Sequence, residues 1–180
     1  MNRTKTITGI VIVILLGIGG FFFWYSKGTA DKSVHGALQE RSAEAVFALT
    51  LADFNGNPVR LADFKGKNII VNVWASWCPY CREELSYFES VQGEYGEKLM
   101  ILAANHGEKP ETAERYLNET ALGRNLIYLL DSNDSLYKTI QGFSMPETIF
   151  IDKQGAIRFH KRGPMNREEI RWRAQDIFGI

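Results

Sequence analysis

The sequence predicts a mixed α/β domain that follows an apolar N-terminal segment. Short apolar runs rich in Val and Ile alternate with stretches in which apolar residues recur at helical spacing. This alternation is typical of a sheet covered by helices. Residues 44–180 also have the length of one domain, so we expect one folded unit there.

The first part of this domain predicts a hairpin and a central strand. Ala45 to Leu51 is expected to be a strand, Asp53 to Pro58 contains an Asn-Gly turn signal, and Val59 to Leu61 returns; together they have the pattern of a hairpin. Asn68 to Trp74 is apolar on both faces apart from Asn72. We therefore expect a central strand with helices on both sides.

Two helices and a strand are expected next. Proline suits the first position of a helix, so one helix is expected from Pro79. Lys98 to Ala104 predicts a strand, and Pro110 begins the second helix. The apolar stripe of the first helix comprises Cys81, Leu85, Phe88, Val91 and Tyr95, and that of the second comprises Ala113, Tyr116, Leu117 and Ala121.

The rest of the chain continues the alternation. Leu126 to Leu130 predicts a strand and Ser135 to Ile140 a short helix. Glu147 to Ile151 and Ala156 to Lys161 are expected to be strands joined by a turn at residues 152–155.

A final helix is expected after Asn166, because Glu169 follows it at the spacing of a capping box. Its apolar face comprises Ile170, Ala174, Ile177 and Phe178.

The two cysteines of the chain, Cys78 and Cys81, lie close together directly after the predicted central strand. Two thiols separated by two residues, at the end of a strand and the start of a helix, can form a disulfide and reopen by thiolate attack. A redox site is therefore the leading interpretation of this pair.

Other uses of a cysteine pair fit the sequence less well. A tetrahedral zinc site needs four ligands, whereas His35, His106 and His160 are scattered singly. Haem attachment would need histidine directly after the second cysteine, where the chain has Arg82. A peroxide-reducing thiol usually has threonine at the position of Ala75. A structural disulfide would more often close a long loop.

No charged residue interrupts the apolar segment Ile7 to Tyr25. As a helix it would be about 28 Å long, close to the ~30 Å hydrocarbon thickness of a membrane. We interpret it as an uncleaved transmembrane signal anchor, and a signal peptide cleaved near residues 28–30 is the competing interpretation. Residues 1–6 would be a cytoplasmic tail and residues 26–43 a linker.

The orientation of the anchor is predicted from its short N-terminal tail, which resembles the first part of a signal peptide and normally stays in the cytoplasm. The flanking positive charges are nearly balanced. We expect a single-pass protein of the cell membrane with its folded domain outside the cytoplasm. One reactive cysteine pair without stray thiols suits that oxidising side.

Charge argues against a nucleic-acid partner. All 21 acidic residues and 19 of the 21 basic residues lie beyond Ser26, which gives that part of the chain a formal charge of about −2. A nucleic-acid-binding domain would have a basic patch.

Four stretches of the chain carry a resemblance to a known family: Leu61–Lys67, Asn72–Glu84, Met145–Asp152 and Gly163–Met165. They resemble the membrane-anchored thioredoxin-like thiol-disulfide oxidoreductases of the TlpA, ResA and CcmG type, and the pattern is nearest to the ResA-like members. The resemblance implies a thioredoxin-like fold with an N-terminal β-hairpin extension and a central strand-helix insertion, which residues 98–130 would supply.

The resemblance also implies partners. The substrate would be a disulfide of an exported protein, either the haem-binding cysteines of an apocytochrome c during cytochrome c maturation or a spore-envelope protein. A membrane thiol transporter would supply the electrons. We expect no cofactor besides the redox-active cysteine pair, and no metal.

The residues of the cysteine motif have distinct expected roles. Cys78 is expected to attack the substrate, because a helix N-terminus stabilises a thiolate, and Cys81 to resolve the mixed disulfide. Trp77 is expected to cover the thiols and to contact the substrate. Pro79 and Tyr80 are expected to contact the substrate.

A second loop enters the site through the resemblance. Pro146 matches the position of the family's cis proline, which faces the disulfide and leaves backbone groups free to pair with an extended substrate. Met145 would then face the substrate. Two departures from the family are Ser86, in place of a kinking proline, and the dipeptide Pro79-Tyr80, which resembles that of glutaredoxins and leaves the direction of electron flow open.

Glu84 is the carboxylate of greatest interest, because it lies three residues after Cys81 and beside the buried stripe. Burial is expected to raise its pKa. Asn72 stands where thioredoxin has a buried aspartate and cannot titrate, so Glu84 is expected to accept the proton of Cys81. The alternative is a solvated helix glutamate like Glu83.

The sequence thus predicts a thiol-disulfide oxidoreductase that reduces an exported protein. An oxidase that donates its disulfide is an alternative, which a measured potential would distinguish. A second alternative is a thioredoxin-like binding module without turnover, including one that binds copper.

Overall fold

The computed structural model describes residues 43–120, 122 and 125–180. These residues belong to one compact unit, Gln39–Ile180. The predicted anchor Ile7–Tyr25 and residues 26–42 of the predicted linker lie outside them. Within the described part of the chain, no helix has the length and apolar character needed to cross a membrane.

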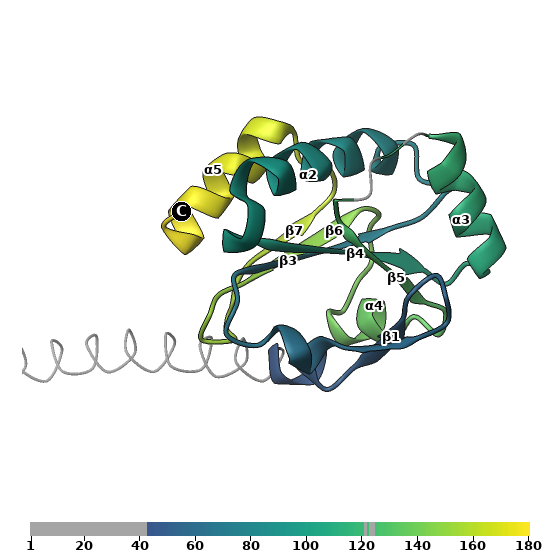
Figure 1. Cartoon of the computed structure of the whole chain (residues 1–180), viewed down its shortest axis with the longest axis horizontal. Helices are drawn as coiled ribbons and strands as arrows, with labels where there is room; N and C mark the ends of the chain where they lie inside the picture. Colours follow the sequence, from purple (N-terminus) through teal and green to yellow (C-terminus); the bar gives the residue numbers. More distant parts are fainter. Residues whose placement is uncertain (1–42, 121, 123–124) are drawn as a thin grey trace, which may run out of the picture. The chain divides into compact units, whose positions relative to one another are not determined.

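A seven-stranded sheet organises the domain (Figure 1), in the order β2-β1-β5-β4-β3-β6-β7. The central strand β3 pairs parallel with β4 and antiparallel with β6, and every residue of β3 is buried. The strands are β1 (Thr50–Ala52), β2 (Pro58–Arg60), β3 (Ile69–Trp74), β4 (Met100–His106), β5 (Ile127–Asp131), β6 (Glu147–Ile151) and β7 (Ile157–Arg162).

Helices cover both faces of this sheet. Figure 1 shows α2 and α5 on one face, and α4 together with residues 43–47 on the other. The helices are α2 (Cys81–Tyr95), α3 (Pro110–Glu119), α4 (Ser135–Thr139) and α5 (Arg167–Phe178), with 3-10 turns η1 (Leu61–Phe64) and η2 (Gly96–Lys98).

Each face of the sheet has its own hydrophobic core, because successive side chains of a strand point to opposite faces. Ile70 and Trp74 of β3 belong to the core under α2 and α5, which also contains both cysteines. Val71 and Val73 belong to the core under α4. The apolar composition of the predicted central strand therefore reflects two buried faces.

The predicted strand Ala45–Leu51 is wrong in its first half. Residues 43–47 are helical, and β1 begins at Thr50. Ala43, Val46 and Phe47 are buried in the core under α4, and their i, i+3, i+4 spacing places them on one face of a helical turn. The expected hairpin is nevertheless present, since β1 pairs antiparallel with β2.

The predicted cap of the last helix is confirmed. Asn166 Oδ1 accepts a hydrogen bond of 2.8 Å from the Glu169 N–H, which satisfies one of the free donors at the start of α5. The ion pair between Arg171 of α5 and Glu94 of α2, at 2.8 Å, joins the two helices. α5 is thereby held beside the helix that begins at the cysteines.

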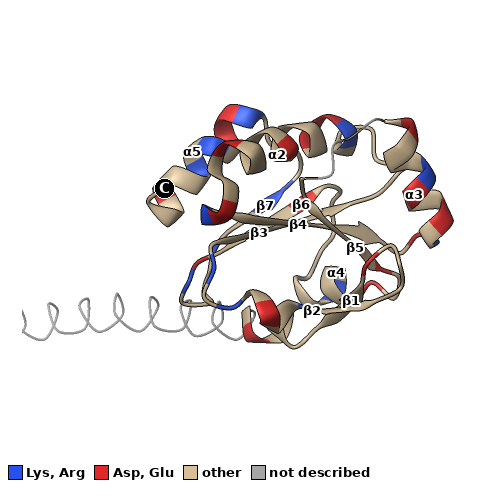
Figure 2. Ribbon diagram, in the orientation of Figure 1, with Lys and Arg blue, Asp and Glu red and all other residues tan. Residues whose placement is uncertain are grey.

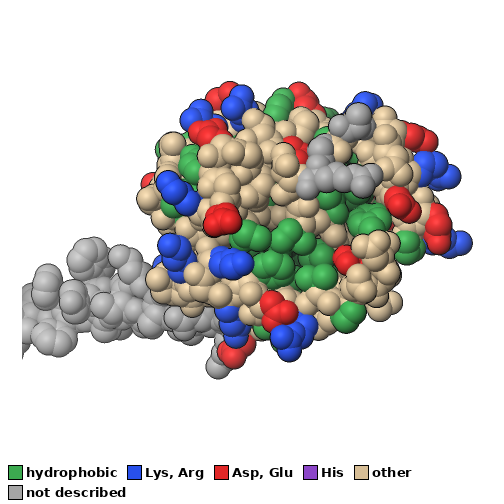
Figure 3. Space-filling model, viewed as in Figure 1, with side chains coloured by type: hydrophobic (Ala, Val, Ile, Leu, Met, Phe, Trp, Pro, Cys, Tyr) green, Lys and Arg blue, Asp and Glu red, His purple; other side chains and the backbone are tan. Residues whose placement is uncertain are grey.

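The surface separates charged and apolar side chains. Figure 2 shows the charged residues mainly on the helices and the connecting loops. Figure 3 shows hydrophobic side chains gathered in the middle of the drawn face, between the layer of α2 and the layer of α4.

Candidate redox site

The disulfide between Cys78 and Cys81 lies just beyond the carboxyl end of β3. Their Cα atoms are 5.4 Å apart. Cys78 is 2% exposed and Cys81 is 0% exposed, so both are buried in the disulfide form. The predicted pairing of these two cysteines is confirmed.

The asymmetry of the pair comes from the start of the helix. α2 begins at Cys81 and not at Pro79 as predicted, because Pro79 and Tyr80 form a turn. The backbone N–H of Cys81 donates to Sγ of Cys78 at 3.1 Å. The Cys78 sulfur therefore accepts the first N–H of the helix, and this donor together with the helix dipole favours a thiolate at Cys78.

The loop before the cysteines is held by Glu108, which sequence reasoning missed. The carboxylate of Glu108 accepts hydrogen bonds from the backbone N–H and hydroxyl of Ser76 and from Asn105 Nδ2. Glu108 lies in the connection after β4, and no local motif marks it. The parallel pairing of β3 with β4 brings this connection beside the cysteine loop.

Glu84 is buried, as predicted. Its Oε2 accepts from Asn72 Nδ2 at 2.8 Å, and its Oε1 accepts from the Met165 N–H at 2.9 Å. Burial raises the pKa of Glu84 to about 7, and these two hydrogen bonds oppose the rise. Asn72, at the position of thioredoxin's aspartate, is thus bonded directly to the carboxyl group expected to replace that aspartate.

The bond between Met145 and Pro146 is cis, as the resemblance implied. The Pro146 carbonyl accepts from the Gly163 N–H at 2.9 Å. Met145 is partly buried and packs against the core that contains both cysteines. Among the described residues, the backbone N–H and carbonyl of Met145 have no backbone hydrogen-bond partner.

Glu147 follows this proline and is the second functional carboxylate that sequence reasoning missed. It is fully buried, and its Oε1 accepts from the N–H groups of Phe143 and Ser144 at 2.7 and 2.8 Å. Its Oε2 lies 2.7 Å from His160 Nε2. The register of β6 on β3 pairs Glu147 with Val73. Glu147 therefore anchors the proline loop at the end of the strands where the cysteine loop begins.

Exposed aromatic side chains lie in both the cysteine loop and the proline loop. Trp77 and Tyr80 belong to the cysteine loop, and Phe143 belongs to the proline loop. The ring of Trp77 lies edge-on to His106, with centroids 6.3 Å apart. Pro79 is exposed and lines a hollow with Arg82, Glu83, Ser86, Thr120 and Leu122.

His106 belongs to a cluster that joins the two loops. Its Nδ1 lies 2.9 Å from Oδ1 of Asp134, and its ring centroid is 4.3 Å from that of Tyr137. The Tyr137 hydroxyl donates to the Ser144 carbonyl at 3.1 Å. His106 and His160 therefore both have carboxylate partners distant in sequence, whereas His35 lies outside the described residues.

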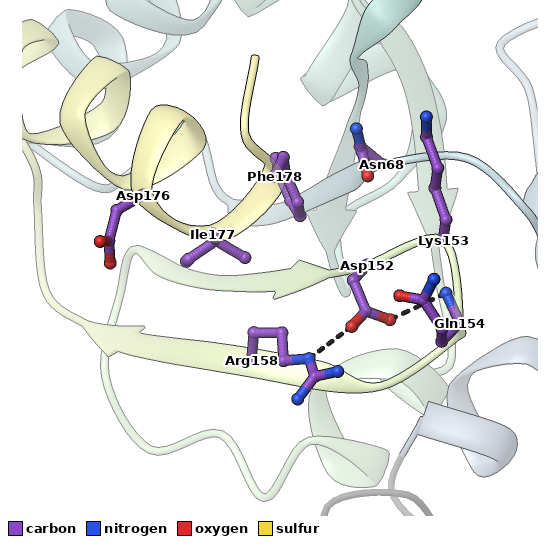
Figure 4. Close-up of a pocket in the computed structure, with 8 residues that line it drawn as sticks. All are labelled: Asn68, Asp152, Lys153, Gln154, Arg158, Asp176, Ile177 and Phe178. Atoms are coloured by element: carbon purple, nitrogen blue, oxygen red, sulfur yellow. Dashed lines mark hydrogen bonds and ion pairs between the residues drawn. The ribbon is translucent and has the colours of Figure 1, made fainter.

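A further pocket lies at the other end of β3 (Figure 4). Asn68, directly before β3, and Asp152, directly after β6, line it with Arg158. Figure 4 shows Asp152 between Arg158 and Gln154, and these contacts shape the turn between β6 and β7. None of the predicted site residues lines this pocket. Across the described ranges, no three metal-ligating side chains are grouped as a metal site.

The fold and the disulfide site define a thiol-disulfide oxidoreductase with a thioredoxin-like fold. The Redoxin family model matches residues 39–175, and the chain belongs to this family.

Individual relatives agree with this assignment. The chain is 29% identical over 167 residues to the thioredoxin-like protein YneN of Bacillus subtilis (strain 168), with 92% of this chain and 94% of the relative covered. It is also 29% identical over 171 residues to the thiol-disulfide oxidoreductase ResA of Geobacillus kaustophilus (strain HTA426), with 94% and 93% covered.

A solved structure supports the fold. The crystal structure of the pneumococcal exposed lipoprotein thioredoxin Etrx1 from Streptococcus pneumoniae strain TIGR4 superimposes with a TM-score of 0.62 at 29% identity. The match covers 72% of this chain and 98% of that one.

Proposed function

We propose that this chain is a membrane-tethered, extracytoplasmic oxidoreductase that reduces the disulfide of a specific exported protein. The observation that carries the proposal is the Cys78–Cys81 disulfide at the start of α2, with the Cys81 N–H on the Cys78 sulfur. The tether rests on the apolar segment Ile7–Tyr25. The candidate substrates, an apocytochrome c or a spore-envelope protein, and the membrane thiol donor rest on the family resemblance.

The reaction begins with the cysteine pair reduced. The Cys78 thiolate attacks one sulfur of the substrate disulfide, a mixed disulfide forms, and the other substrate sulfur leaves as a thiolate that takes a proton. The Cys81 thiolate then attacks the Cys78 sulfur and releases the second substrate thiolate. Two electrons pass from the pair to the substrate, and a thiol donor returns them to the pair.

Glu84 is the acceptor we propose for the Cys81 proton. With a pKa of about 7, its carboxyl group can gain and lose a proton near neutral pH. Asn72 Oδ1 has no hydrogen-bond partner among the described atoms. If the Asn72 amide turns over when Glu84 is protonated, that oxygen accepts the new O–H, so both forms of Glu84 keep a partner.

The substrate is proposed to be an extended polypeptide. The unpaired backbone of Met145, next to the cis proline, offers an N–H and a carbonyl to a chain that lies across the disulfide. A small thiol compound has no matching backbone.

The test is capture in cells that carry the full chain. Cys81→Ala is expected to accumulate a mixed disulfide with an exported protein, because resolution is blocked, whereas Cys78→Ser captures none. An adduct that forms with Cys78→Ser instead would reverse the assigned roles. The redox potential of the purified chain separates the reductase from an oxidase, which would have a clearly more oxidising potential.

The topology has its own test. A reporter that is active only outside the cytoplasm, fused after Ile180, is expected to be active. Activity of a cytoplasmic reporter at the same position would contradict the proposed orientation.

A further inference from the structure

Large aromatic side chains are exposed at few positions of the described chain. They are Phe143 at 73%, Trp77 at 62%, Tyr80 at 59% and Trp172 at 53% exposed. Three of the four lie in the two loops that border the disulfide, and Trp172 lies on α5. Phe143, three residues before Pro146, is the most exposed of them.

Phe143 is held in place although its ring is open to solvent. Its backbone N–H donates to Glu147 Oε1 at 2.7 Å. The guanidinium carbon of Arg162 lies 4.5 Å from the centroid of its ring, within the range of a cation–π contact. Backbone and ring are thus fixed from different sides.

The residues that support Phe143 are themselves hydrogen-bonded. Glu147 is fully buried, and its second oxygen faces His160. Oε1 of Glu147 also accepts from the Ser144 N–H, and the Ser144 carbonyl accepts from the Tyr137 hydroxyl. The loop therefore presents its aromatic ring from a backbone that is hydrogen-bonded on both sides.

A preordered aromatic side chain loses little conformational entropy on binding. Aromatic residues of this kind dominate the affinity of many protein interfaces. Phe143 is two residues from Met145, whose backbone is free, so a chain that pairs with Met145 would bring a neighbouring side chain near the ring of Phe143. Arg162 occupies one side of the ring and leaves the exposed surface for that side chain.

We propose that Phe143 is a specificity-determining residue that contacts an apolar side chain next to the reacting cysteine of an extended polypeptide substrate. Glu147 and Arg162 are positioning residues that act through Phe143. The proposal deepens and rests on the proposed function of the same site. It predicts that substitution of Phe143 changes the selection among polypeptide substrates and does not change the intrinsic reactivity of Cys78.

The test uses the full-length chain, purified in detergent and reduced, with three disulfide substrates. Two are peptides with an intramolecular Cys-X-X-Cys disulfide, one with leucine and one with serine beside each cysteine. The third is bis(2-hydroxyethyl) disulfide, which has neither a backbone nor an apolar side chain. Values of kcat and KM are measured for each, with dithiothreitol as the electron source.

Phe143→Ala is expected to lower kcat/KM for the leucine peptide about tenfold, mainly through a higher KM, as for the loss of an interface anchor. The serine peptide and the small disulfide should react as with wild type. Phe143→Tyr should retain the preference for leucine, and Arg162→Gln should weaken it. Trp172→Ala is the matched control, an exposed aromatic outside the two loops, and should change nothing.

Two results would overturn the proposal. One is equal kcat/KM for the leucine peptide in wild type and Phe143→Ala. The other is an equal loss of kcat/KM on all three substrates, which would mean that Phe143 maintains the structure of the site and does not select the substrate. Failure of the proposed function looks different: wild type would then reduce none of the three substrates faster than dithiothreitol alone, or its redox potential would be that of an oxidase.

Discussion

Two buried glutamates flank the redox site on opposite faces of the sheet. Glu84 lies on α2 and bonds to Asn72, whose neighbours Ile70 and Trp74 belong to the core under α2 and α5. Glu147 is paired with Val73 of the core under α4, and paired residues of neighbouring strands point to the same face. One buried glutamate therefore lies on each face of the sheet near the site.

The partners of the two carboxylates differ. Glu84 has two hydrogen-bond donors, and burial raises its pKa to about 7. Glu147 accepts from two backbone N–H groups and the Ser144 hydroxyl, pairs with His160, and lies 4.0 Å from Arg162. A buried carboxylate with few donors can store a proton, whereas one surrounded by donors organises a loop. The two carboxylates are similarly buried, and their different partners fit the proposed role of Glu84 as a proton acceptor and the contacts of Glu147 with the proline loop.

The largest expected effect concerns Cys78, around which both glutamates are arranged. Cys78→Ser in the full chain should lower turnover of a disulfide peptide at least about a thousandfold, because the attacking thiolate is lost. Turnover is followed with dithiothreitol as electron source. Cys81→Ala is the control and should still form a mixed disulfide. Substantial activity of Cys78→Ser would show that Cys78 is not the attacking cysteine, and the comparison of the two glutamates around it would then fail.

The second largest expected effect is a loss of stability when the Glu147 carboxylate is removed. Glu147→Ala leaves two backbone N–H groups and His160 without their acceptor, which should cost about 2–4 kcal/mol of unfolding free energy. Urea denaturation measures it. Glu94→Ala, which breaks a partly exposed ion pair with Arg171, is the control and should cost less than about 1 kcal/mol. Equal costs would show that Glu147 does not hold the loop.

The pH dependence of stability should distinguish Glu84. Its pKa of about 7 in the folded chain lies above the ordinary 4.5, so the folded protein binds a proton that the unfolded chain releases. This contribution is complete below pH 4.5 and is lost as the pH rises through 7, by up to about 3 kcal/mol.

Urea denaturation of the oxidised chain at a series of pH values measures this loss. Glu84→Gln should remove the decline between pH 4.5 and 7, and the exposed neighbour variant Glu83→Gln should retain it. A decline that persists in Glu84→Gln would place the titrating group elsewhere.

The smallest expected effect is on resolution of the mixed disulfide. Glu84→Gln should slow release of substrate about tenfold near neutral pH, because the thiolate fraction of Cys81 falls, while the first attack by Cys78 changes less. The rate of alkylation of each thiol across pH measures the thiolate fractions of Cys78 and Cys81 separately. Identical Cys81 profiles in Glu84→Gln and the control Glu83→Gln would make Glu84 a structural carboxylate only.

Local patterns predicted much of the fold and of the site. The cysteine spacing, the buried run of β3, the stripe of α2 and the cap at Asn166 each depend on residues close in sequence. The prediction failed at residues 43–47, where an apolar stretch compatible with a strand is helical. Short apolar runs do not distinguish the two states, and packing under the sheet decided between them.

Sequence patterns were enough to predict the redox pair, the position of the cis proline through family resemblance, and the placement of Glu84 near Cys81, because these relations span a few residues or match a motif. The contacts of Glu147, His160 and Glu108 are evident only in the folded chain. Their partners come from separate strands and loops, which strand pairing brings to one end of the sheet. Hydrogen bonds and burial depend on distance in space, and a single sequence does not contain that distance for residues far apart along the chain.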